Sequence, residues 1–137
     1  MSKTAFIIGL NSQDGIHLAV FYRKMGYSVF GLVRNKSIIS IVHKKILQRL
    51  NVSIQRADYN NYVEVERILK KTIPTVIINL SGESSVGRSF VNPLEAYQSI
   101  VGFSENLLRI VKDNVELRRS KILMISSGEV FGDRSLK

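Results

Sequence analysis

The sequence contains no cysteine and no tryptophan, and only two histidines and two prolines. The absence of cysteine excludes disulfide bonds and thiolate metal sites. His17 and His43 lie far apart along the chain, and neither has carboxylates at the spacing of a metal site. We therefore expect no metal centre.

Long apolar runs are also absent. No stretch of about 18 apolar residues is available to span a bilayer, and the first residues lack the basic-then-apolar order of a signal peptide. We therefore expect a soluble, cytoplasmic protein that has no membrane partner. With 137 residues, of which 45% are hydrophobic, the chain has enough apolar side chains for one buried core. We interpret residues 1–137 as one domain.

Acidic residues are scarce, because 11 of them stand against 20 basic ones and the net charge is +9. Such a charge favours a polyanionic partner. However, the basic residues are dispersed over 34–56, 67–71 and 109–121, without interleaved aromatics or a nucleic-acid-binding motif. We expect no nucleic-acid partner. Two interpretations remain: solvated helix faces, or attraction of a phosphorylated small molecule.

Five short apolar runs rich in β-branched residues recur along the chain, at residues 4–8, 28–33, 52–55, 75–80 and 121–125. Each has the length of a strand, and four of the gaps between or after them hold a helical pattern. A parallel neighbour is reached only by a crossover, so this alternation is typical of βαβ units. The sequence predicts an α/β fold, a Rossmann-like doubly wound parallel sheet in the order 3-2-1-4-5 that ends after its fifth strand.

Four helices are predicted, over about residues 14–25, 35–50, 62–71 and 93–111. The first stops at Gly26, and Asn35 or Ser37 caps the second. The fourth begins near Pro93, a residue suited to the first turn of a helix. The buried stripe of the second helix is expected to include Ile38, Ile41, Val42 and Leu50.

A glycine loop, Gly9-Leu10-Asn11-Ser12-Gln13-Asp14-Gly15, follows the first predicted strand and opens a helix. Gly9 allows a sharp turn and Gly15 lets the helix pack closely on the strand. The helix N-terminus then offers unpaired N–H groups to a pyrophosphate. Ser12 stands where the dinucleotide-binding pattern has its middle glycine. An ordinary strand-to-helix turn is the alternative interpretation.

Arg34 ends the second predicted strand and is followed by Asn35 and Lys36. An NAD site places an acidic residue here for the ribose 2′-hydroxyl, whereas a 2′-phosphate prefers arginine, so NADP is favoured. A solvated loop charge is the alternative. Asp58, after the third strand, suits either the adenine amino group or a turn. We expect one rim to carry Gly9, Arg34, Asp58, Ser81 and Ser126.

Three segments resemble the extended short-chain dehydrogenases, the family of NAD-dependent epimerases and dehydratases. Residues 9–15 look like their glycine loop, and Gln13-Asp14-Gly15 is similar to the version found in GDP-mannose 4,6-dehydratases. Residues 79–86 resemble the segment that runs beside the nicotinamide and opens onto the sugar. Residues 126–132 resemble the signature whose Ser/Thr and Glu point at the sugar ring. The resemblance covers essentially the whole chain in the right order and spacing.

The resemblance implies an NADP-binding part of a lyase that acts on a sugar nucleotide such as GDP-mannose. The reaction would be oxidation at C4, elimination of water and return of the hydride. Ser127 would hydrogen-bond the hydroxyl that is oxidised, and Glu129 would remove the proton from the carbon next to the resulting ketone. A strand-end serine and a helix-starting acid are the alternative interpretation of this pair.

The implied binding residues fall into two sets. The cofactor set is Gly9, Ser12, Gln13, Asp14, Gly15, Arg34, Asp58, Leu80, Ser81 and Gly82. The substrate set is Glu83, Ser84 and Ser85. Ser85 stands where the family often has histidine, and Glu83 stands where it has glutamine. Glu83 would place negative charge beside an anionic ligand unless a cation answers it, and Arg88 is the nearest one in the sequence.

The printed sequence ends at Lys137, before the Tyr-x-x-x-Lys pair with which such enzymes move the hydroxyl proton. We therefore expect dinucleotide binding without turnover by this chain alone. A non-catalytic Rossmann binding module, or part of a related sugar-nucleotide epimerase or dehydratase, remains an alternative. The last predicted strand would be an unpaired sheet edge, so we also expect a homo-oligomer or poor solubility.

Overall fold

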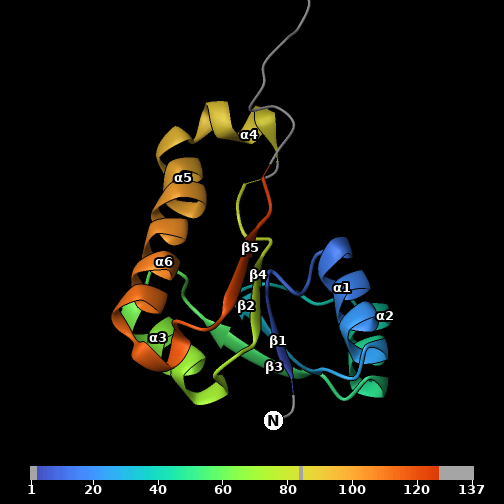
Figure 1. Cartoon of the computed structure of the whole chain (residues 1–137). Helices are drawn as coiled ribbons and strands as arrows, with labels where there is room; N and C mark the ends of the chain where they lie inside the picture. Colours follow the sequence, from blue (N-terminus) through green and yellow to red (C-terminus); the bar gives the residue numbers. More distant parts are fainter. Residues whose placement is uncertain (1–2, 84, 127–137) are drawn as a thin grey trace, which may run out of the picture.

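The structure is a computed structural model, which describes residues 3–83 and 85–126. Its centre is a parallel sheet in the order β3-β2-β1-β4-β5, as the sequence predicts (Figure 1). The strands are β1 (Thr4–Ile8), β2 (Ser28–Arg34), β3 (Ser53–Ala57), β4 (Val76–Asn79) and β5 (Lys121–Met124). The order reverses between β1 and β4, and in such sheets ligands bind beyond the carboxyl ends of the strands at this point.

Helices cover both faces of the sheet. Helices α1 (Gln13–Lys24) and α2 (Ile41–Arg49) lie on one side, and α3 (Tyr62–Thr72) and α6 (Phe103–Asp113) lie on the other (Figure 1). The remaining helical segments are α4 (Val86–Val91), α5 (Pro93–Tyr97), the π-helix η1 (Gln98–Gly102) and the 3₁₀ turn η2 (Val115–Leu117). Among the helices in the described ranges, none is long and apolar enough to cross a bilayer.

Strand β1 separates two apolar clusters, because successive side chains of a strand point to opposite faces. Phe6 and Ile8 pack in the cluster beneath α3 and α6, whereas Ala5 and Ile7 pack in the cluster beneath α1 and α2. All four side chains are fully buried. A parallel sheet covered on both faces requires such a continuous apolar strand, and its burial holds the loop that follows β1 in a fixed place.

The second helix differs from its prediction. Helix α2 starts at Ile41, and Ser40 caps it by accepting the His43 N–H at 3.2 Å. The predicted caps, Asn35 and Ser37, instead lie in a loop. One side-chain nitrogen of Arg56 holds this loop by donating to the carbonyls of Arg34, Asn35 and Ser37 at 3.2, 3.0 and 2.9 Å.

The later start of α2 also overturns its predicted buried stripe. Ile38, Ile41 and Val42 are 86%, 75% and 65% exposed, and Leu50 is only partly buried. Leu47 is the fully buried residue of this helix, and Ile46 packs partly beside it. The prediction was wrong because the face of Ile41 and Val42 continues with Lys45 and Arg49, whereas the buried face carries Ile46 and Leu47.

The predicted fourth helix is confirmed from Pro93 onward, but it is not uniform. Helix α5 begins at Pro93, passes into η1 and continues as α6 to Asp113. A short preceding helix, α4, was not predicted; it starts at Ser85, whose hydroxyl accepts the Arg88 N–H at 3.3 Å. A π-helical turn inside an α-helix often marks a functional site, and here it borders the rim of the sheet.

Candidate functional site

The carboxyl ends of the parallel strands meet at one edge of the sheet, which carries the expected rim residues. Two neighbouring cavities open there, of about 480 and about 220 Å³. The smaller cavity lies over the glycine loop, and the larger one lies between the ends of β2 and β3 and the segment from α5 to α6. Arg34 and Tyr59 line both cavities.

Gly9 is required for the predicted sharp turn, whereas Gly15 is required because the start of α1 lies against the backbone of the loop itself rather than against the strand. Gly9 has φ +83°, and a Cβ atom on it would lie 3.3 Å from Leu80. A Cβ atom on Gly15 would lie 2.6 Å from the Leu10 carbonyl oxygen, closer than such contacts occur. The first turn of α1 therefore lies as close to the backbone of Gly9 and Leu10 as a glycine allows. The start of α1 faces the smaller cavity.

Ser12, which replaces the middle glycine, is the N-cap of α1. Its hydroxyl accepts the Gly15 N–H at 3.0 Å and donates to the Gly9 carbonyl at 2.8 Å. Gln13 and Asp14 form the exposed first turn of the helix. Ser12 therefore satisfies a helix-terminal N–H group from within the loop and stabilises the turn without a ligand.

Tyr59 is the site residue that the sequence interpretation missed. Its side chain is 7% exposed, and its hydroxyl accepts the Gly9 N–H at 3.2 Å and donates to the Leu32 carbonyl at 3.0 Å. Burial raises the pKa of Tyr59 to about 12, against the smaller lowering effects of the Gly9 N–H and the nearby Arg34. The available signal was a tyrosine directly after Asp58, at the end of a strand.

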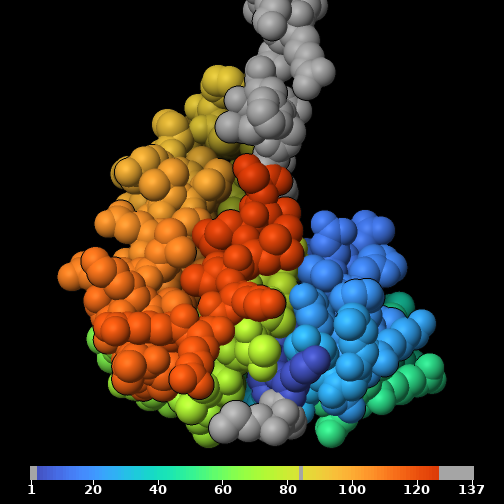
Figure 2. All heavy atoms as spheres, viewed as in Figure 1, coloured from blue at the N-terminus to red at the C-terminus, as the bar shows by residue number. Residues whose placement is uncertain are grey.

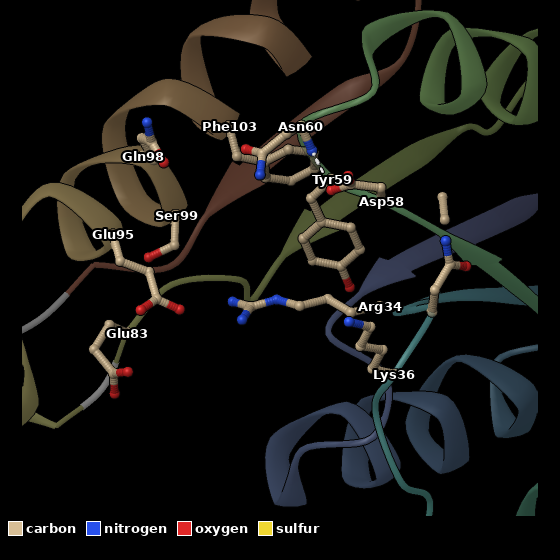
Figure 3. Close-up of a pocket in the computed structure, with 12 residues that line it drawn as sticks. Arg34, Lys36, Asp58, Tyr59, Asn60, Glu83, Glu95, Gln98, Ser99 and Phe103 are labelled. Carbon is tan, nitrogen blue, oxygen red and sulfur yellow. Dashed lines mark hydrogen bonds between the residues drawn. The ribbon is translucent and has the colours of Figure 1, made fainter. Parts of the chain in front are cut away.

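The larger cavity has a basic side and an acidic side. Arg34, Asn35 and Lys36 come from the end of β2, and the Arg34 guanidinium lies over the Tyr59 ring, 5.5 Å from its centroid. Three carboxylates line the same cavity from other elements: Asp58, Glu83 and Glu95. Figure 3 shows Arg34 reaching across the cavity below Tyr59. Such a site suits a ligand with an anionic group at one end and hydrogen-bond donors at the other.

Asp58 stabilises the turn after β3 and also lines the larger cavity. Its carboxylate accepts the Asn60 N–H at 3.0 Å, and its own N–H donates to Glu64 at 3.1 Å. This is the turn-forming role that the sequence left open. Asp58 is also exposed and lines the larger cavity, so its role in the turn is compatible with its predicted contact with a cofactor.

The segment after β4 closes the smaller cavity from the other side. Leu80, Ser81 and Gly82 line this cavity together with Gly9 and Ser12. The Asn79 side-chain oxygen accepts both the N–H and the hydroxyl of Ser81. A Cβ atom on Gly82, which has φ +147°, would lie 3.2 Å from the side chain of Ile100 in η1. The fold thus brings these predicted cofactor residues together.

Glu83 forms an ion pair with Arg88, the cation nearest to it in the sequence. Its carboxylate accepts from Arg88 Nη2 at 2.6 Å and Nε at 3.0 Å, and from the Ser85 N–H at 2.9 Å. The Ser85 N–H, followed by Arg88, holds the pKa of Glu83 below its ordinary value. Glu83 and Ser85 are thus joined at the start of α4. The other predicted sugar-side residues, Ser84, Ser127 and Glu129, lie outside the described residues.

The strand order and the glycine loop at the switch point define the Rossmann-like class of α/β domains. The family model described as GDP-mannose 4,6 dehydratase matches residues 6–136, and the chain belongs to this family. Within residues 3–83 and 85–126, no three His, Cys, Asp or Glu side chains are grouped to hold a metal ion.

Two curated relatives illustrate the similarity. The GDP-mannose 4,6-dehydratase of Vibrio cholerae serotype O1 is 28% identical over 95% of this chain and 36% of its own length. The GDP-mannose 4,6 dehydratase of Homo sapiens is 29% identical over 95% of this chain and 37% of its own length. The chain therefore spans little more than a third of the length of these relatives.

Solved structures share the fold. A UDP-glucose 4-epimerase from Bifidobacterium longum, in complex with NAD+ and UDP, superposes with a TM-score of 0.82 at 23% identity. The match covers 95% of this chain and 38% of the epimerase. The UDP-Glc/GlcNAc 4-epimerase of Campylobacter jejuni gives a TM-score of 0.84 at 17% identity, over 96% of this chain and 39% of the epimerase.

Proposed function

We propose that this chain is the NADP(H)-binding part of a sugar-nucleotide 4,6-dehydratase, with GDP-mannose as the substrate. The observation that carries the choice of cofactor is Arg34, which ends β2 and faces the cavity next to the glycine loop. An arginine at this position suits a 2′-phosphate, whereas a 2′-hydroxyl is held by an acidic residue. Membership in the GDP-mannose 4,6 dehydratase family supports the substrate.

The two cavities fit the parts of such a cofactor. The pyrophosphate would lie over Gly9, whose lack of a side chain allows close approach, and over the first turn of α1, where the N-terminal end of the helix favours an anion. The 2′-phosphate would lie between Arg34 and Lys36 in the larger cavity, and Asp58 would accept from the adenine amino group. The phosphates would thus meet the basic side of the site, and the adenine donor would meet an acidic residue.

On the sugar side, we propose that Glu83, Ser84 and Ser85 face the substrate. Arg88 neutralises the carboxylate of Glu83, so this residue adds little repulsion against an anionic sugar nucleotide. We propose the catalytic roles implied by the resemblance for Ser127, as the partner of the sugar hydroxyl, and for Glu129, as the base. The bound cofactor would supply hydride acceptance and return.

Isothermal titration calorimetry with NADPH and NADH tests the choice of cofactor. We expect NADPH to bind about tenfold or more tightly, because one charge-assisted contact contributes about 1.5–3 kcal/mol. Arg34→Gln should abolish this preference and leave NADH binding nearly unchanged. Arg49→Gln removes the same charge from the end of α2, outside both cavities, and serves as the matched control.

Two results would contradict the proposal in different ways. Equal binding of NADPH and NADH by the unchanged chain would show that Arg34 does not select the cofactor. Failure to bind either dinucleotide, with a folded chain verified by circular dichroism, would reject the proposed function itself.

A further inference from the structure

Three side chains from distant parts of the chain form a stack at the wall of the larger cavity. The rings of Tyr59 and Phe103 are stacked with centroids 4.8 Å apart and an interplanar angle of 24°. The Arg34 guanidinium lies 5.5 Å from the Tyr59 centroid. Figure 3 shows Tyr59 between Phe103 and Arg34. The stack therefore connects α6, the end of β3 and the end of β2.

Tyr59 is fixed at both ends of its side chain. Phe103, only 1% exposed, supports the ring. The hydroxyl donates to the Leu32 carbonyl and accepts the Gly9 N–H, which also donates to the Leu32 carbonyl at 2.9 Å. A rotation of the ring would break both hydrogen bonds and the aromatic stack. Tyr59 thus presents Arg34 with an aromatic surface that stays in place, and it connects this surface directly to the glycine loop.

Arg34 needs such a support, because its side chain is exposed and long. A guanidinium gains from lying on an aromatic ring, and a pre-oriented side chain loses less conformational entropy when an anion binds. Glu83 and Glu95 line the same cavity and attract the guanidinium away from β2. Among the described residues, however, no ion pair joins Arg34 to either carboxylate.

We propose that Tyr59 is a positioning residue that sets the cofactor preference of this chain by holding the Arg34 guanidinium against its ring inside the cavity. This inference rests on the proposed function, because it concerns the choice between NADPH and NADH. It assigns the two ends of Tyr59 different tasks. The ring acts on the 2′-phosphate through Arg34, and the hydroxyl acts on the glycine loop and hence on both dinucleotides.

The test compares Tyr59→Leu with Tyr59→Phe by calorimetry against both dinucleotides. Tyr59→Leu removes the aromatic surface and should lower the ratio of NADPH to NADH affinity about two- to fivefold, the range of a partly exposed cation–π contact. Tyr59→Phe keeps the ring and removes the hydroxyl. This variant should bind both dinucleotides more weakly, and its ratio of NADPH to NADH affinity should equal that of the unchanged chain.

A double-mutant cycle separates positioning from general loosening of the site. In the Arg34→Gln background, Tyr59→Leu should leave the affinity ratio unchanged, because its effect passes through Arg34. Three results would overturn the proposal. The first is that Tyr59→Leu lowers the ratio of NADPH to NADH affinity equally with and without Arg34. The others are that Tyr59→Leu leaves this ratio unchanged, or that folded Tyr59→Phe loses the preference for NADPH. If Tyr59→Leu does not fold, Tyr59→Met replaces it, because its flexible side chain fills the core without a ring.

The failures are distinguishable. An unchanged chain that binds neither dinucleotide rejects the proposed function and this inference together. An unchanged chain that prefers NADPH, with Tyr59→Leu retaining the full preference, rejects only the role of Tyr59.

Discussion

Gly15 is the tightest residue of the glycine loop, because a Cβ atom on it would lie 2.6 Å from the Leu10 carbonyl oxygen and 2.8 Å from that of Gly9. Both obstacles are backbone atoms, which no rotamer change can move. We expect Gly15→Ala to lower the free energy of unfolding by about 2–3 kcal/mol, as overpacking does in a core. Urea unfolding followed by circular dichroism measures this change.

Gly87, in α4, is the matched control for Gly15. A Cβ atom added to it would meet nothing within 4 Å. Gly87→Ala should therefore be neutral or stabilise the chain by up to about 1 kcal/mol through helix propensity. If both alanine variants behaved alike, the close approach of Gly15 to the carbonyl oxygens of Leu10 and Gly9 would not be what requires glycine at position 15.

The ionisation of Tyr59 makes the free energy of unfolding depend on pH in the alkaline range. Its pKa is raised from 10.0 to about 12 in the folded state, so the neutral form is favoured by folding. The stabilisation is complete below pH 10 and is lost as the pH rises through 12. From the size of this shift we expect about 2–3 kcal/mol in total. Unfolding midpoints in urea between pH 8 and 11 should fall more steeply for the unchanged chain than for Tyr59→Phe, and parallel curves would contradict this assignment.

At the scale of elements, α2 buries a different face from the one predicted. Leu47 is fully buried, whereas Ile41 is 75% exposed on the same helix. We expect Leu47→Ala to cost about 2–5 kcal/mol, and Ile41→Ala to stay within about 0.5 kcal/mol. Thermal or urea unfolding of the two variants checks which face is buried. A larger loss from Ile41→Ala would restore the stripe predicted from the sequence.

The elements themselves were largely predictable, and their boundaries were less so. Short β-branched runs separated by helical patterns predicted the strands, and Pro93 marked the start of α5. The start of α2 was predicted too early, because Asn35 and Ser37 lie in a loop whose carbonyls Arg56 binds from the neighbouring strand β3. The π-helix η1 likewise has no signature in the local apolar spacing.

At the scale of the whole molecule, β5 is the last strand of the sheet within residues 3–83 and 85–126, and apolar side chains on it are exposed. Ile122 and Met124 pack against the core beneath α6, but Leu123 and Ile125 are 46% and 50% exposed on the other face. Figure 2 shows β5 at the surface between the α6 side and the α1 side. An exposed apolar edge strand favours pairing between copies of the chain. We propose that the chain self-associates through this edge.

Size-exclusion chromatography with light scattering measures this association. Leu123→Lys should shift the chain toward monomer, because a charge on an edge strand opposes pairing. Val63→Lys adds the same charge on α3, where Val63 is 69% exposed, and should leave the association unchanged. A monomeric unchanged chain at high concentration would contradict the proposal.

The sequence by itself determined the parallel α/β architecture, the strand order and the placement of Gly9, Arg34 and Asp58 on one rim. These features follow from local periodicity and from the few ways in which βαβ units connect. Only the tertiary structure decided the role of Tyr59, whose hydroxyl meets a backbone N–H 50 residues away in the chain. No local pattern encodes such a contact, because it exists only when β1, β2 and β3 are already side by side.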